Sequence, residues 1–406
     1  MIRAPRRVLS LAILLVLVAT ACSTSTGSGG GGTKGPIVIG GTLGLTGAFA
    51  LPSTEYKAVY DRWVEQVNAR GGLLGRQVKM VIYNDEGNPT TAQSLYNRLI
   101  NRDKADLLLA PFTTFVGGAI VPIALTNRKV LFNGGFVGIK LFDQAKGWVV
   151  GSYTYQEPDY TKGIFELIKQ LPPQDRPTRA AILTAQNPFP EVVRDGYKGQ
   201  GGALNYARQN GIRVVLNEEY PPSTTDFSGL IQRAKAAGAD LFLELGLPND
   251  SLQVARTMYQ QGFKPKIACM CGSQVTTLPA WSKLGAPAEG IMGTTISWPT
   301  QNFTGLDDLA SFYKSRGVDQ ISVYGEVATA ILQVLEQAVE GAKTLDQAKL
   351  KDYLLSHTFQ TVDGPIRYQP NGTPVYSQLI VQWTKGRNQV VWPSDQATAH
   401  AVVTSG

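Results

Sequence analysis

The stretch IVIGGTLGL at residues 37–45 decides the fold class, because it begins an alternation of apolar strands and amphipathic helices. Its run of aliphatic residues predicts a buried strand. Behind it, apolar residues recur at helical spacing from Tyr56 to Val67, which predicts an amphipathic helix, and the β-branched run at 77–83 predicts the next strand. Asn88-Pro89 then offers a helix N-cap with proline at the first helical position. The pattern continues with strands expected at 106–110 and 130–132 and a helix at 116–125.

The same alternation repeats further along the chain. Strands are expected at 179–184, 213–217, 240–245 and 266–269, with helices starting near Pro190, Asp226 and Asp250, a long late helix from Tyr324 to Leu335 and a strand-like end at 365–392. Alternating strands and helices form parallel sheets that are covered on both faces, and such sheets bind ligands at the carboxyl ends of their strands. The predicted fold class is α/β, with two doubly wound parallel-sheet lobes.

Composition excludes several classes of function. The 406 residues are 43% hydrophobic and 17% charged, which is too apolar for a disordered chain. The formal net charge is +7, and three positive charges (Arg3, Arg6 and Arg7) lie at the extreme N-terminus, which leaves 7 − 3 = +4 on the rest. No cluster of Lys and Arg remains that would bind nucleic acid. With 2 histidines and 3 cysteines, the chain is expected to hold no metal and no other cofactor.

The N-terminus has the pattern of an export signal. Its arginines precede an apolar run at 8–18, which is shorter than the about 20 residues that span a bilayer. The run ends in Ala19-Thr20-Ala21-Cys22, which resembles the lipobox of bacterial lipoproteins. This implies removal of residues 1–21 and lipidation of Cys22; the alternative is a plain secretory signal in which Cys22 is incidental. Residues 22–35 follow as a Gly/Ser tether. We expect a protein that is exported and lipid-anchored to a bacterial membrane, facing the periplasm or the cell exterior.

Several phrases along the body resemble a single family. They are IVIG with LTG at 37–47, VNARGGLLGR at 67–76, TTDFS with AAGAD at 224–240, YGEVA at 324–328 and Gly364-Pro365. In this order they resemble the type I periplasmic substrate-binding proteins of ABC importers, the Leu/Ile/Val-binding group, over about residues 36–393.

The resemblance implies two lobes joined by three crossovers, and a monomer that closes around a small solute and docks on an ABC permease. The first lobe would comprise 36–155 and 290–362, the second 156–289 and 363–395, and 396–406 would be a tail. The solute would be a branched-chain amino acid or a related amide or carboxylate. The alternative is a ligand-sensing receptor of the same fold that signals to a partner protein.

The predicted binding residues lie just past the strands, where hydroxyls and free N–H groups suit a carboxylate or another polar head. For three of these residues, Thr46, Thr113 and Thr114, an ordinary loop role stays open. Together with the residues that the resemblance implies, the predicted binding residues are Thr46, Phe112, Thr113, Thr114, Asn133, Gly134, Gly135, Phe189, Gly246, Leu247, Cys271 and Tyr324.

One departure from the family bears on the solute. Members that bind α-amino acids commonly carry an acidic residue near the position of Cys271, whereas no Asp or Glu lies between Lys264 and Pro287 here. A buried unpaired ammonium costs several kcal/mol. Either Glu244, Asp250 or Glu157 replaces that acid, or the ligand carries no cation, which leaves amides, ureas and organic acids open.

Cys269 and Cys271 do not form a metal or CxxC redox motif, because only one residue separates them and no histidine lies nearby. We expect two buried thiols, with Cys271 lining the cleft, and a disulfide as the alternative. Neither His357 nor His400 lies in a catalytic motif, so an enzyme is not expected.

Overall fold

The first sheet follows directly from the alternation that begins at residue 37. In the computed structural model, which describes residues 35–151, 155–296, 302–375 and 378–404, five strands pair in the order β2-β1-β3-β4-β5. The signal segment 1–21, Cys22 and the tether up to residue 34 lie outside the described residues. The strands are β1 (Ile37–Leu43), β2 (Val78–Asn84), β3 (Leu107–Leu109), β4 (Leu131–Phe132) and β5 (Val149–Val150), all parallel.

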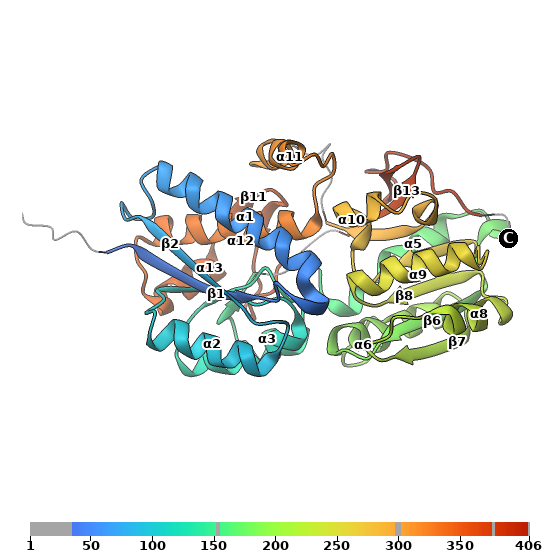
Figure 1. Cartoon of the computed structure of the whole chain (residues 1–406), viewed down its shortest axis with the longest axis horizontal. Helices are drawn as coiled ribbons and strands as arrows, with labels where there is room; N and C mark the ends of the chain where they lie inside the picture. The colour runs from blue at the N-terminus through green and yellow to red at the C-terminus, as the bar shows by residue number, and fades with distance from the viewer. Residues whose placement is uncertain (1–34, 152–154, 297–301, 376–377, 405–406) are drawn as a thin grey trace, which may run out of the picture. The chain divides into compact units, whose positions relative to one another are not determined.

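Helices from two distant parts of the chain cover this sheet. Figure 1 shows α1 and α12 on one side of β1, and α2 and α3 on the other. The Asn88 side chain accepts hydrogen bonds from the Thr90 and Thr91 N–H groups at 2.8 and 3.1 Å, which confirms the predicted cap of α2. The helices are α1 (Ala50–Ala69), α2 (Pro89–Asn101), α3 (Thr114–Thr126), α4 (Ile139–Ala145), α11 (Leu306–Ser315), α12 (Val323–Ala342) and α13 (Gln347–Ser356).

The turn after α1 shows why its glycines are required. Gly72 has φ +80, and a Cβ at this position would lie 1.8 Å from the Arg76 carbonyl oxygen. Its N–H donates to the Val67 carbonyl at 2.9 Å and so closes the helix end. The role of the segment VNARGGLLGR is therefore to turn the chain from α1 into β2.

The second sheet has seven strands in the order β14-β13-β10-β9-β8-β6-β7. Its strands are β6 (Arg179–Ala185), β7 (Arg213–Tyr220), β8 (Leu241–Leu245), β9 (Ile267–Met270), β10 (Met292–Thr295), β13 (Leu379–Thr384) and β14 (Arg387–Trp392). The first five are parallel, whereas β13 runs antiparallel to β10 and β14 antiparallel to β13. Its helices are α5 (Lys162–Gln170), α6 (Pro188–Asp195), α7 (Ala203–Gln209), α8 (Ser228–Ala236), α9 (Pro248–Gln260) and α10 (Pro279–Ser282).

In both sheets the second strand in sequence lies at the edge, next to the first, and the later strands are added on the other side of the first strand. The order β7-β6-β8-β9-β10 repeats the order β2-β1-β3-β4-β5. This doubly wound arrangement confirms the predicted α/β fold, and it creates a switch point in each sheet where the connections diverge. We call the part built on β1–β5 the first lobe and the part built on β6–β10, β13 and β14 the second lobe.

The expected lobe boundaries need correction at three places. Residues 290–296 were expected in the first lobe, but β10 pairs with β9 and β13 of the second. A break at 363 would divide the hairpin of β11 (Thr358–Thr361) and β12 (Gly364–Arg367), in which Phe359 pairs with Ile366. The expected tail after 395 hydrogen-bonds to the second lobe, because the Thr398 N–H donates to the Val390 carbonyl at 2.8 Å.

Two features are absent from the described residues. Within them, none of the helices has both the length and the apolar character that crossing a bilayer requires. The same residues contain no cluster of three His, Cys, Asp or Glu side chains suited to a metal ion.

Candidate functional site

A cavity lies at the carboxyl ends of strands from both lobes. About 350 Å³ of space there is free of atoms, part of it open to solvent. The loops after β3, β4, β6, β8 and β9 and the start of α12 form it. Its lining residues are Phe112, Thr113, Thr114, Gly135, Phe136, Val137, Phe189, Gly246, Leu247, Pro248, Gly272, Ser273 and Tyr324.

Four helices begin at this cavity. Thr114 is the first residue of α3, Phe189 and Tyr324 are the second residues of α6 and α12, and Leu247 is the N-cap of α9. A helix N-terminus carries a positive partial charge because its first N–H groups have no partner within the helix. Four of them around one cavity favour a ligand with a negative or strongly hydrogen-bond-accepting group.

The side chains that line the cavity are apolar, aromatic or hydroxylated. Among these lining residues none is charged. The polar side chains are those of Thr113, Thr114 and Ser273, of which Thr113 is the N-cap of α3 and Ser273 is 4% exposed. Charge complementarity in this cavity therefore comes from the backbone rather than from an ion pair.

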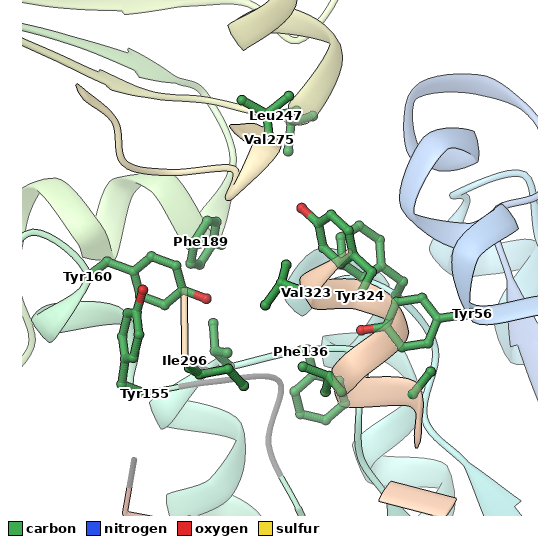
Figure 2. Close-up of a cluster of buried hydrophobic side chains, with 14 of the residues drawn as sticks. Tyr56, Phe136, Tyr155, Tyr160, Phe189, Leu247, Val275, Ile296, Val323 and Tyr324 are labelled. Carbon is green, nitrogen blue, oxygen red and sulfur yellow. The ribbon is translucent and has the colours of Figure 1, made fainter. Parts of the chain in front are cut away.

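Aromatic rings from both lobes form the walls. Tyr56, Phe112 and Tyr324 pack against one another with ring centroids 5.6–6.2 Å apart. Opposite them, Phe189 contacts Tyr160 edge to face at 4.9 Å, and Figure 2 shows these two rings facing Val323 and Tyr324. The Tyr324 hydroxyl donates to the Ser273 carbonyl, so one lining residue of the first lobe binds one of the second.

The structure brings eight of the twelve predicted binding residues to this cavity. They are Phe112, Thr113, Thr114, Gly135, Phe189, Gly246, Leu247 and Tyr324. Their contact with a ligand stays a prediction.

The other four predicted residues lie elsewhere. Thr46 is exposed, and its hydroxyl accepts from the Asn84 side chain at 3.0 Å. The Asn133 side chain is buried, and its oxygen accepts from the Gly135 and Phe136 N–H groups at 3.0 Å, so that it shapes the lining loop without lining the cavity. The Gly134 carbonyl accepts from the Tyr56 hydroxyl.

Cys271 departs from its expected position for a different reason. Its sulfur is bonded to that of Cys269, where we expected two thiols, and the two Cα atoms are 5.1 Å apart, within the range that a disulfide bridges. Both residues are fully buried, and the next two residues, Gly272 and Ser273, line the cavity instead.

Sequence reasoning missed five lining residues: Phe136, Val137, Pro248, Gly272 and Ser273. Each is one or two residues beyond a predicted one. The signal available was the position of the strand ends, which locates the loop but leaves the direction of each side chain open.

Two acids lie behind the wall formed by the α9 N-terminus. Glu244 is fully buried, and its carboxyl accepts from the Ser251 hydroxyl at 2.6 Å and the Tyr220 hydroxyl at 3.1 Å. Burial raises its pKa to about 8, and burial raises the pKa of Asp250 to about 6. The Ser251 and Ser273 hydroxyls are 2.6 Å apart, so a chain of hydrogen bonds joins Glu244 to the cavity wall.

Glu157 joins the two lobes beside the cavity. It lies in η2 (Glu157–Asp159) at the entry to the second lobe and is 1% exposed. Its carboxyl accepts from the Ile139 N–H at 3.1 Å and the Thr114 hydroxyl at 3.4 Å, both in the first lobe. Burial raises its pKa to about 8, against the opposing effect of these hydrogen bonds. None of the three candidate acids is among the lining residues.

Residues 36–388 match the periplasmic binding protein family. The chain belongs to that family. Its fold is that of a type I periplasmic binding protein, as expected from the sequence, and the proteins it resembles bind solutes rather than catalyse reactions.

Relatives and solved structures of similar proteins cover nearly the whole chain. An "Amino acid binding protein" of Pseudomonas aeruginosa is 25% identical over 362 residues, which are 86% of this periplasmic binding protein and 90% of the relative. The branched-chain amino acid transporter substrate binding protein LivJ of Streptococcus pneumoniae, in complex with isoleucine, has a TM-score of 0.73 at 17% identity and covers 88% of this chain and 100% of its own. A solute binding protein of an R. palustris ABC transporter, in complex with benzoate, has a TM-score of 0.74 at 16% identity, covering 91% and 98%.

Proposed function

We propose that this protein captures a small organic carboxylate or amide without an ammonium group in the cavity between its lobes and delivers it to an ABC permease. The family supports binding of a small solute, and the neighbours in complex with isoleucine and benzoate show that the fold accepts both amino acids and aromatic acids. The choice between them rests on the cavity of this chain.

The observation that carries the proposal is the lining, which combines four helix N-termini with aromatic walls and has no charged side chain among the residues that the structure describes. The N-termini and the hydroxyls of Thr113 and Thr114 offer hydrogen-bond donors to a carboxylate or carbonyl oxygen. The rings of Phe112, Phe189 and Tyr324 suit an apolar or flat body.

An α-amino acid fits this lining less well, because its ammonium needs an acceptor of negative charge. The nearest acids are used elsewhere: Glu244 and Asp250 bind the Tyr220 hydroxyl, and Glu157 binds Thr114 and Ile139. Raised pKa values of about 8 for Glu244 and Glu157 mean that both are largely neutral at pH 7. A neutral carboxyl outside the cavity compensates an ammonium poorly.

The route of the solute follows from the proposed location. Lipidation of Cys22 would hold the protein at the membrane, and the Gly/Ser segment behind it would let the body move on the order of 20 Å from that surface. Closure of the lobes on the solute would create the surface that the permease recognises.

Thermal unfolding of the purified protein with matched pairs of solutes tests the proposal. Each pair differs only in the ammonium: leucine and 4-methylpentanoate, or phenylalanine and 3-phenylpropanoate. A ligand that binds only the folded state stabilises it by about 2.7 kcal/mol at 100 times its Kd. We expect the deaminated member of a pair, benzoate or a short amide to raise the midpoint. A larger shift with leucine would refute the ammonium-free ligand, and no shift with any solute would refute capture.

A further inference from the structure

One of the five loops that line the cavity is held by a covalent bond. Polar side chains cap the other four loops, each accepting a hydrogen bond from a nearby backbone N–H group; they are those of Thr113, Asn133, Asn187 and Asp250. The loop after β9 begins instead with the disulfide between Cys269, in the strand, and Cys271, just past it. This bond closes a ring at the point where the chain leaves the sheet and enters the cavity wall.

The disulfide controls the position of Gly272 and Ser273, the lining residues that follow it, and we call this pair the β9 wall. The Cys271 and Gly272 N–H groups both donate to the Glu244 carbonyl, at 3.1 and 3.2 Å, which sets the direction of the turn over β8. Gly272 packs so closely that a Cβ there would lie 2.8 Å from the Gly246 nitrogen. Because such packing transmits small shifts, a movement of Cys271 reaches the cavity within one residue.

Ser273 connects the β9 wall to both lobes. Its hydroxyl lies 2.6 Å from that of Ser251 in the second lobe, and its carbonyl accepts from the Tyr324 hydroxyl of the first. The bond to Tyr324 can form only while the lobes are together. When they separate to admit a solute, the disulfide and the hydrogen bonds within the second lobe remain to hold the wall. The disulfide therefore preorganises the wall in the form that a solute meets first.

Reduction of the disulfide would both release this constraint and crowd the same point. Cys269 and Cys271 are fully buried, and two thiol sulfurs cannot stay at bonding distance, so the side chains must separate within a close-packed interior. Cys269 is fixed because β9 pairs with β8 on one side and β10 on the other. The turn at Cys271 is the part that can move, so reduction should displace or loosen the β9 wall.

We propose that the Cys269–Cys271 disulfide is a redox-modifiable site that positions the β9 wall for the solute, so that the oxidised protein binds tightly and the reduced protein weakly. The inference rests on the proposed function and adds a regulation of the same cavity. A small dithiol is the reductant: the bond between the cysteine sulfurs breaks, each sulfur gains one electron and one proton, and the dithiol is oxidised to a cyclic disulfide. By linkage, a solute that favours the oxidised form protects the disulfide by the same factor.

Calorimetric titration of the full-length protein with 4-methylpentanoate and with benzoate, before and after treatment with dithiothreitol, measures the effect on binding. The reduced protein should bind about tenfold more weakly, the ratio expected when binding must reorder one residue of the wall. The double variant Cys269→Ala, Cys271→Ala should bind like the reduced protein and should not respond to dithiothreitol, which excludes an effect through Cys22. It also tests the positioning if the buried bond resists the dithiol. Equal affinities of the oxidised protein and the double variant would overturn the inference.

Hydrogen exchange of the free protein separates positioning of the wall from a general effect on stability. Reduction should speed amide exchange in residues 271–278, because local opening of this loop no longer works against a covalent bond. Helix α13 of the first lobe is the internal control and should exchange at an unchanged rate. Equal acceleration in both segments would mean that the disulfide serves the stability of the whole protein, and the inference would then be wrong.

The reciprocal measurement follows the disulfide instead of the solute. The ratio of reduced to oxidised dithiothreitol that reduces half of the protein should rise about tenfold when 4-methylpentanoate or benzoate saturates the cavity. An unchanged ratio in the presence of a solute that binds would contradict the coupling. If neither solute binds the oxidised protein, the proposed function fails instead, and the exchange of residues 271–278 still decides whether the disulfide holds the β9 wall.

Discussion

Glu244→Gln should make the stability of this protein less dependent on pH. The Glu244 carboxyl is fully buried between Tyr220 and Ser251, and burial raises its pKa from 4.5 to about 8. In the unfolded chain the proton dissociates near pH 4.5, whereas the folded chain retains it to about pH 8. Between these values the folded state binds one more proton than the unfolded state, so its stability falls as the pH rises.

The size of the effect follows from one proton. The free energy of unfolding should decrease by about 1.4 kcal/mol per pH unit between pH 4.5 and 8 on account of Glu244, several kcal/mol in all. Glutamine resembles the neutral carboxyl and can keep the hydrogen bonds with Tyr220 and Ser251, but it does not titrate. Asp250, whose pKa burial raises to about 6, and Glu157 continue to contribute in the variant.

Denaturant unfolding at pH 5, 6, 7 and 8 measures the effect. We expect the curve of Glu244→Gln to be flatter than that of the wild-type protein by about 1.4 kcal/mol per pH unit, with its largest relative gain at pH 8. Glu65→Gln, at an exposed position of α1, is the control and should follow the wild type. Parallel curves for wild type and Glu244→Gln would refute the reasoning, because they would mean that the buried carboxyl is ionised in the folded protein.

Three further predictions concern the cavity. Tyr324→Phe removes the hydrogen bond between the lobes and should weaken solute binding about three- to tenfold. The control Tyr313→Phe loses a 2.6 Å hydrogen bond to Glu55 away from the cavity and should lower the unfolding midpoint only. Equal affinities of the two variants for the solute would contradict this prediction. Gly117→Ala in α3 places a Cβ 2.6 Å from the ring of Phe136, and it should cost about 1–3 kcal/mol of stability and weaken solute binding. The control Gly118→Ala has no atom closer than 4.0 Å to its new Cβ and should stabilise α3 by about 0.5–1 kcal/mol. A higher unfolding midpoint for Gly117→Ala than for Gly118→Ala would exclude the clash. The wild type should lose affinity for a carboxylate above pH 8, where ionised Glu157 would repel the ligand beside Thr114, and Glu157→Gln should abolish this loss. A loss that persists in the variant would assign it to another group.

Apolar periodicity predicted the elements that have long apolar patterns. The run at 37–45 became β1, the run at 77–83 became β2, and the cap at Asn88 began α2 as expected. These segments bury one side chain after another against the sheet, so their own composition specifies them.

Elements with short or mixed sequences could not be found this way. Residues 292–295 read MGTT, with no aliphatic run, and form β10 because β9 and β13 flank them and supply their hydrogen bonds. The pairing partner β13 lies more than 80 residues away, and local propensity carries no information on it.

The candidate site was predictable to the level of loops. Strand ends placed Thr113 and Gly246 at the cavity, because carboxyl ends of parallel strands meet at one edge. The same rule did not bring Thr46 or Cys271 to the cavity, because Thr46 is exposed just before η1 (Gly47–Phe49) and the disulfide holds the side chain of Cys271. Both outcomes depend on backbone geometry after the strand, which residue type alone does not determine.

The interleaved order of the two lobes has a consequence for how the chain reaches its native state. Helix α12, which packs on α1, comes from residues 323–342, after five strands of the second lobe, and β13 and β14 complete the second sheet only at residues 379–392. Neither lobe can therefore complete its core while the C-terminal part of the chain is missing. Contacts across such long separations in sequence form slowly. A newly synthesised chain would thus stay unfolded while it emerges, which is the form in which a protein threads through a narrow secretion channel.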